Sequence, residues 1–129
     1  MKTIFFCHDT QANPRARSHD LEMAGYQVLL VPSGVELLRM MANKTPDLIL
    51  LDILLEGDNG FDVCKNIQAR PGICPPIIMF AGVYSRAGFR LEALRLGAKE
   101  FLSTELFRDE FLDAVVKTIG DAEDAMAAA

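Results

Sequence analysis

The chain has 129 residues, a formal net charge of -5 and a hydrophobic fraction of 50%. That length suits one domain with a single core and is too short for two. The acidic balance argues against nucleic-acid binding, which needs clustered basic residues. No apolar run reaches the roughly 20 residues of a membrane span, and the N-terminus lacks a signal-peptide pattern. We therefore expect a cytoplasmic protein that contacts neither nucleic acid nor membrane.

Five short apolar runs alternate with segments of helical period, which is the pattern of repeated β-α units. The expected strands are Thr3 to Cys7, Gln27 to Val31, Leu48 to Asp52, Ile77 to Ala81 and Glu100 to Leu102. The expected helices run around Ala12 to Ala24, Gly34 to Asn43, Gly60 to Ala69, Arg86 to Leu96 and Phe107 to Ile119. Residues 1–119 are thus predicted to form one domain, and residues 120–129 a flexible tail or the start of a linker.

Local signals refine these elements. Ser33 is a suitable N-cap for the second helix, and Gly25 and Gly97 lie where a glycine commonly ends a helix. The first helix has a thin apolar face, chiefly Ala16, Leu21 and Ala24.

Cysteine usage is the next signal. Cys7, Cys64 and Cys74 are odd in number and lack metal-ligand spacing, so we interpret them as reduced thiols. Cys7 and Cys64 are expected to fill core positions.

The run from Pro46 to Asp52 is the most informative stretch of the chain. It is apolar without alternation, which is typical of a parallel strand buried on both faces. Asp52 ends the run and is followed by a loop, so its carboxylate is expected at the sheet edge where open α/β folds bind ligands.

Several motifs occur in an order and at separations that resemble the receiver domain of bacterial two-component response regulators. They are Lys2 to Asp9, Ala24 to Val28, Pro46 to Asp52 with Gly57 and Gly60-Phe61, Pro76 to Met79, and Leu96 to Leu102. The resemblance covers about residues 2 to 119. It implies an α/β, flavodoxin-like (βα)5 fold, a doubly wound parallel sheet with strand order 2-1-3-4-5.

The resemblance also implies a chemistry, the formation of an aspartyl phosphate on Asp52. The phosphoryl group would come from a histidine kinase or a phosphotransfer protein, with Mg2+ neutralising charge. Receivers place an acidic pair after the first strand, but here the pair is His8-Asp9. Asp9 and Asp52 are therefore the only implied carboxylate ligands, which predicts a weak Mg2+ site.

Two further positions depart from the family pattern. The Thr or Ser after the fourth strand falls on Ala81, or on Gly82 if the loop is shifted by one, and neither can donate a hydrogen bond from its side chain. The Lys-Pro after the fifth strand falls on Thr104 and Glu105, so the fixed positive charge is lost. Glu56 also replaces the proline common after the acceptor. These changes predict poor phosphoryl chemistry.

His8 has two interpretations. It is either a neutral histidine of a surface loop, or a local cation that replaces the metal beside Asp9 and Asp52, since free histidine ionises near pH 6.5. In the first interpretation the hydroxyl of Thr104 caps a turn. Asp52 then has no remaining role and is retained because a carboxylate at a strand end is easily solvated.

The implied partner surface is the fourth helix, fifth strand and fifth helix, where a histidine kinase, another signalling protein or an output domain would bind. Arg86, Arg90 and Arg95 lie on the helix, Phe101 takes the position of the aromatic switch residue, and Glu105 and Arg108 lie nearby. The alternative is that Phe89, Leu91, Leu94 and Phe101 are core and the arginines a solvated face.

We therefore expect a degenerate receiver that is not an enzyme and acts as a protein-interaction module, with no cofactor beyond weak Mg2+. The main alternative is a working phosphoacceptor on Asp52 that uses Mg2+ and reacts slowly. A hydrolase or flavin-binding protein of the same fold is a distant third, because no Gly-rich phosphate loop and no nucleophile-base pair is visible.

Overall fold

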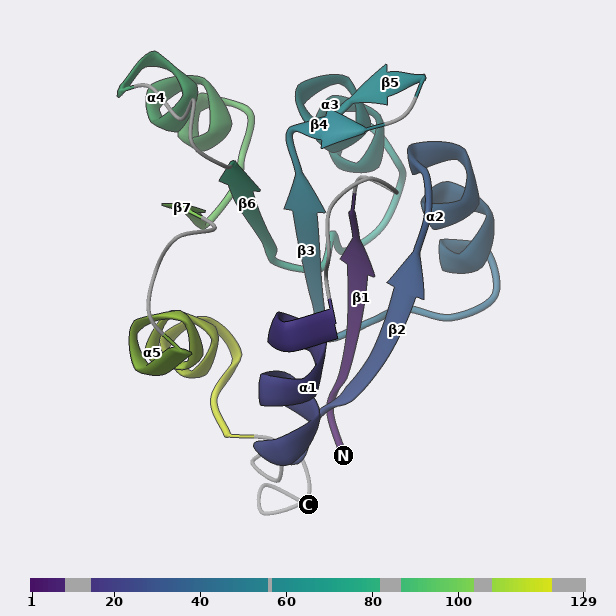
Figure 1. The fold of residues 1–129 in the computed structure, drawn as a ribbon. Coiled ribbons are helices and arrows are strands. Elements are labelled where there is room, and N and C mark those ends of the chain that lie inside the picture. Colours follow the sequence, from purple (N-terminus) through teal and green to yellow (C-terminus); the bar gives the residue numbers. More distant parts are fainter. Residues whose placement is uncertain (9–14, 56, 82–86, 104–107, 122–129) are drawn as a thin grey trace.

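A five-stranded parallel sheet forms the centre of the molecule (Figure 1). The structure is a computed structural model, and it describes residues 1–8, 15–55, 57–81, 87–103 and 108–121. The strands are β1 Thr3–Cys7, β2 Gln27–Val31, β3 Leu48–Asp52, β6 Ile77–Ala81 and β7 Glu100–Ser103. Their spatial order is β2-β1-β3-β6-β7. Counted along the chain within this sheet, that is the predicted order 2-1-3-4-5, so the fold class is confirmed.

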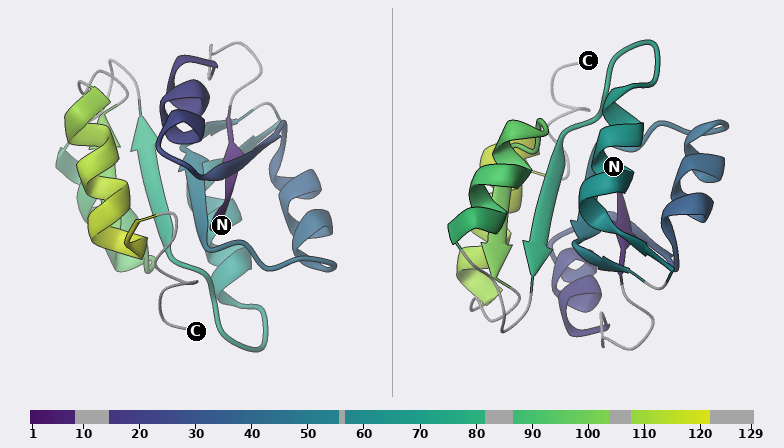
Figure 2. Two further views of the ribbon diagram at one scale, coloured as in Figure 1. Left: turned by 90° about the horizontal axis from the view of Figure 1, so that it is seen from below. Right: turned by 90° about the horizontal axis from the view of Figure 1, so that it is seen from above.

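Helices cover both faces of the sheet (Figure 2). They are α1 Arg15–Met23, α2 Gly34–Met41, α3 Gly60–Gln68, α4 Ala87–Arg95 and α5 Arg108–Ile119. Ser33 caps α2 as predicted, because its Oγ accepts a hydrogen bond from Glu36 N at 3.1 Å. Gly25 and Gly97 follow α1 and α4 with φ of 101° and 103°, a left-handed backbone that favours glycine. The expected helix starts at Ala12, Arg86 and Phe107 lie outside the described residues.

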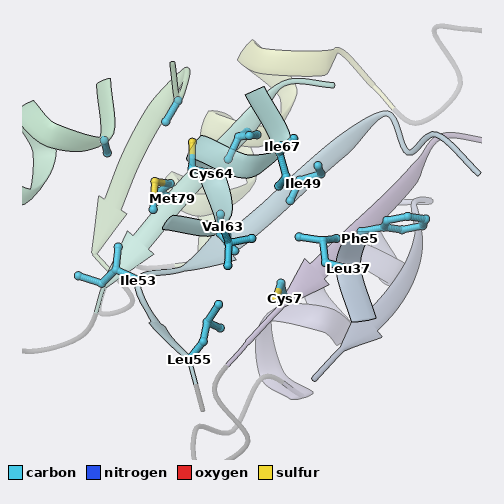
Figure 3. Packing of buried hydrophobic residues seen from close by; sticks show 14 of the residues in the cluster. Phe5, Cys7, Leu37, Ile49, Ile53, Leu55, Val63, Cys64, Ile67 and Met79 are labelled. Atoms are coloured by element: carbon cyan, nitrogen blue, oxygen red, sulfur yellow. The ribbon is translucent and has the colours of Figure 1, made fainter. Parts of the chain in front are cut away.

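Two hydrophobic clusters form the core, one on each face of the sheet. The first joins the sheet to α2, α3 and α4, and it contains Phe5, Cys7, Leu37, Ile49, Val63, Cys64, Ile67 and Met79 among others (Figure 3). The second joins the sheet to α1 and α5, and it contains Ile4, Phe6, Leu21, Leu48, Leu50, Phe80, Phe111 and Val115 among others. Cys7 and Cys64 are buried, and all three cysteines are free thiols, as predicted.

The apolar face of α1 differs from the prediction. Leu21 is buried, but Ala16 and Ala24 are exposed, and Ser18 is the second buried side chain of the helix. Ser18 is tolerated there because its hydroxyl donates to Glu22 Oε1 at 3.1 Å.

The C-terminal end of α5 is hydrogen-bonded to residues that precede β1 and β2. Lys2 Nζ donates to the carbonyl of Ile119, and Tyr26 Oη donates to the carbonyl of Gly120 at 2.7 Å. An ammonium group at this end complements the partial negative charge of a helix C-terminus. Most of the expected tail, residues 122–129, lies outside the described part of the chain. None of the helices in that part is long and apolar enough to cross a membrane.

Candidate functional site

The carboxyl ends of the strands bring the predicted site residues to one edge of the sheet. Asp52 ends β3, Ala81 ends β6, and His8 directly follows β1. Asp52 pairs in register with Phe80 of β6, and Ala81 pairs with Ser103 of β7. The other predicted site positions, Gly82, Asp9, Thr104, Glu105 and Glu56, lie outside the described residues.

Asp52 is buried, with 7% of its surface exposed. Its Oδ1 accepts a hydrogen bond from the backbone N of Leu54 at 3.0 Å. A carboxylate that accepts from the amide two residues ahead forms an Asx turn, which starts a reversal of the chain. The side chain of Asp52 is therefore hydrogen-bonded to the loop that follows β3.

That loop contains a short antiparallel hairpin, β4 Leu54–Leu55 and β5 Asp58–Asn59, which lies beyond the end of β3 beside α3 (Figure 1). The sequence did not predict it, since two-residue strands carry no periodicity. Asn59 caps α3 by accepting from Asp62 N at 2.9 Å.

Strand alternation assigns His8 and Asp52 to the face of the sheet that carries α1 and α5. Phe6 and Leu50 pair in register and belong to the same cluster, and His8 and Asp52 each follow them by two residues. The half-buried imidazole packs edge-on against Phe6, with ring centroids 6.1 Å apart. The pairing of His8 with Asp52 or Asp9 as a local cation stays a prediction.

Ala81 occupies the position where the resemblance implies a hydroxyl. Its methyl group is buried at 2% exposure in the cluster that faces α2, α3 and α4. Ser103, directly opposite it in register, carries a hydroxyl group that no sequence motif indicates. Ser103 was overlooked because it precedes the Thr104 position, and only the register places it beside Ala81.

A second carboxylate near this edge, that of Asp58, was also missed. A methyl group built on Gly34 would lie 3.3 Å from Asp58 Oδ2, so the side chain of Asp58 reaches the start of α2. Burial raises the pKa of the Cys7 thiol to about 12, and the negative charges of Asp52 and Asp58 add to the increase. Cys7 is therefore a buried thiol with a raised pKa, and it is inert at neutral pH.

The cysteines give a prediction on pH. The pKa of Cys7 is raised from 9.0 to about 12 and that of Cys64 to about 11, chiefly by burial. A thiol with a raised folded pKa contributes stability that is fully present below the unfolded pKa and is lost as pH rises through the folded one. The Cys7→Ala variant should therefore lose stability less steeply than wild type between about pH 9 and about pH 12, by at most about 1.4 kcal/mol per pH unit. Urea unfolding of both proteins across this window measures the difference, and parallel pH profiles would contradict it.

The described residues do not by themselves make up a magnesium site. Among them, no group of three or more His, Cys, Asp or Glu side chains could hold a metal ion. A hard divalent cation needs several oxygen ligands, and Asp52 supplies the one described carboxylate of the implied pair. Asp9, the other implied ligand, lies outside the described part of the chain.

Comparison with known proteins decides the family. The response regulator receiver domain family matches residues 4–116. The chain belongs to this receiver domain family. It is 32% identical over 117 residues to the response regulator PleD of Caulobacter vibrioides, and 29% identical over 118 residues to the alkaline phosphatase synthesis transcriptional regulatory protein PhoP of Bacillus subtilis. These matches cover 90% and 92% of this chain, but only 25% and 48% of the two relatives.

Solved receiver domains have the same fold. A CheY-like response regulator receiver domain protein from Methanospirillum hungatei matches with a TM-score of 0.81 at 24% identity, covering 97% of this chain and 98% of the other. The receiver domain of the sensor histidine kinase PA1611 from Pseudomonas aeruginosa matches with a TM-score of 0.80 at 25% identity, covering 93% and 98%. That structure has a magnesium ion coordinated in its active site cleft. Receiver domains are signalling modules of two-component systems, and this chain is one of them.

The face implied for partner binding combines a buried aromatic with charged and apolar exposed residues. Phe101 is buried at 7% exposure, and Arg90 of α4 reaches it, since Arg90 Nη1 donates to Phe101 O at 3.3 Å. Arg90 Nη2 also lies 3.3 Å from Glu100 Oε1. The alternative that these apolar residues are core holds for Phe101 and for Phe89, which packs against the core. It is wrong for Leu91 and Leu94 of α4, which are exposed at 70% and 39%.

Proposed function

We propose that this receiver domain acts as a protein-interaction module whose Asp52 is phosphorylated weakly or not at all. The observation that carries the proposal is the buried methyl group of Ala81, the residue at which the resemblance expects the family's hydroxyl. A phosphoryl group at Asp52 would gain no hydrogen bond from this side chain, and phosphoryl transfer depends mainly on positioning and charge stabilisation.

Sequence positions around the acceptor support the same proposal. Thr104 and Glu105 stand where receivers have Lys-Pro, so a positive charge is replaced by a neutral and a negative residue. His8 stands in the acidic pair, which leaves Asp9 and Asp52 as the implied magnesium ligands. Mg2+ bound there would be held weakly, because two carboxylates bind the ion less tightly than three.

The partner in this proposal is a histidine kinase, another signalling protein or an output domain, bound to the face formed by α4, β7 and α5. Exposed Leu91 and Leu94 supply apolar area on this face, and Arg90 joins α4 to β7. We place the domain in the cytoplasm, without a nucleic-acid or membrane contact of its own and without enzyme activity as its task.

Incubation with acetyl phosphate and Mg2+, followed by intact mass spectrometry, tests the proposal. We expect little or no addition of one phosphoryl mass, because the hydroxyl and the lysine of the family site are absent. Asp52→Asn is the control for the site of any label. Rapid, near-complete labelling that is lost in Asp52→Asn would reject the proposal, and partial labelling over hours with the same control would support the slow phosphoacceptor instead.

A further inference from the structure

Asp52 holds the start of the loop that follows β3. Its Oδ1 accepts from Leu54 N at 3.0 Å, at the point where the hairpin begins. Leu54 then pairs antiparallel with Asn59, and Leu55 pairs with Asp58. Since an Asx turn fixes the direction of the next residues, the carboxylate sets where the hairpin leaves the sheet.

The end of the same loop returns to Asp52. Gly60, the first residue of α3, donates from its N to Ile53 O at 2.8 Å. A methyl group built on Gly60 would lie 2.3 Å from the carbonyl oxygen of Asp52, so the two backbones are in close contact. Asp52 therefore contacts the loop at both ends, through its carboxylate at the start and its carbonyl at the end.

Of the four strand residues of the hairpin, only Leu55 is buried. Leu55 is buried at 8% exposure in the cluster below α3 (Figure 3), whereas Leu54 is 60% exposed. A two-stranded hairpin of this size is not stable alone. It therefore depends on contacts with the rest of the domain, such as the burial of Leu55 and the hydrogen bond from Leu54 N to Asp52.

We infer that the carboxylate of Asp52 is a positioning group that holds the β4–β5 hairpin at the carboxyl edge of the sheet without any phosphoryl group. This inference rests on the proposed function, because it gives the acceptor residue a task in a site that is poorly equipped for phosphate. The anchor needs an acceptor oxygen at Oδ1, and it does not need a negative charge.

Two substitutions of Asp52 separate the anchor from the phosphoacceptor. Asp52→Asn keeps a side-chain oxygen that can accept from Leu54 N, and Asp52→Ala removes it. Both variants remove the acceptor carboxylate together with its negative charge, so any effect of losing that charge is the same in both. A phosphoacceptor role predicts equal defects, whereas the anchor predicts a difference.

The test is hydrogen exchange of the Leu54 amide, followed by NMR on the whole chain without a phosphodonor. We expect exchange within about threefold of wild type in Asp52→Asn and at least about tenfold faster exchange in Asp52→Ala, since a hydrogen bond to a charged or polar partner is lost. Amides of β1 and β3 report whether each variant is folded. If Asp52→Ala does not fold, Asp52→Leu keeps roughly the shape of Asn without an acceptor, and it should show the same loosening of Leu54.

Equal exchange in Asp52→Asn and the variants without an acceptor would overturn the inference. That outcome would leave the proposed function intact, because no phosphoryl group enters the experiment. Conversely, rapid labelling by acetyl phosphate would reject the proposed function while a difference between Asn and Ala still supports the anchor.

Discussion

Replacing Gly60 by alanine is expected to destabilise the domain by about 3 kcal/mol, the upper end of the usual cost of overpacking. A Cβ at this position would lie 2.3 Å from Asp52 O and 2.7 Å from Ile53 Cα. Both neighbours are backbone atoms at the end of β3, so no side chain can rotate away. The loss would be a large share of the roughly 5–15 kcal/mol that holds a domain folded.

Two other glycines provide matched controls for urea unfolding followed by circular dichroism. Gly34→Ala should cost less than Gly60→Ala, because its nearest neighbour is the side-chain Cγ2 of Val63, at 2.4 Å, which can adjust. Gly88→Ala in α4 meets nothing within 4 Å and should stabilise by up to about 1 kcal/mol. An equal effect at Gly60 and Gly88 would contradict the close contact between α3 and β3.

The second large effect is expected from restoring the family residues at the site. The double substitution Ala81→Thr and Thr104→Lys should accelerate labelling of Asp52 by acetyl phosphate at least about tenfold, since each tenfold needs only about 1.4 kcal/mol of transition-state stabilisation. The hydroxyl and the ammonium group would supply hydrogen bonds to the phosphoryl oxygens.

Isosteric variants separate chemistry from packing in this experiment. Ala81→Val adds the bulk of threonine without its hydroxyl, and Thr104→Met adds the length of lysine without its charge. Neither should accelerate labelling, and thermal melting checks that the buried position of Ala81 accepts the larger side chain. A gain with valine equal to that with threonine would show that the missing hydroxyl does not limit the reaction.

The central strands were predictable because a strand buried on both faces appears in the sequence as a continuous apolar run. The run from Leu48 to Asp52 and the run from Ile77 to Ala81 are continuous and apolar, and the structure has both strands with those bounds. A short, continuous apolar run bounded by a carboxylate or a turn needs no tertiary information to be recognised.

The features that the sequence did not reveal depend on contacts between distant or non-periodic residues. The β4–β5 hairpin begins at a hydrogen bond from Leu54 N to Asp52, and Ser103 lies opposite Ala81 only through the β6–β7 register. The burial of Ser18 on α1 likewise depends on a hydrogen bond to Glu22 rather than on hydrophobicity. The position of Asp52 at the sheet edge, by contrast, followed from the end of the apolar run, and the structure confirms it.

The central claim is that the conformation of the face formed by α4, β7 and α5 does not depend on a phosphoryl group on Asp52. Amide chemical shifts of this face, recorded by NMR before and after addition of acetyl phosphate and Mg2+, test it most directly. We predict unchanged shifts for Arg90, Phe101 and their neighbours. A set of shifts across α4, β7 and α5 that disappears in Asp52→Asn would contradict the claim.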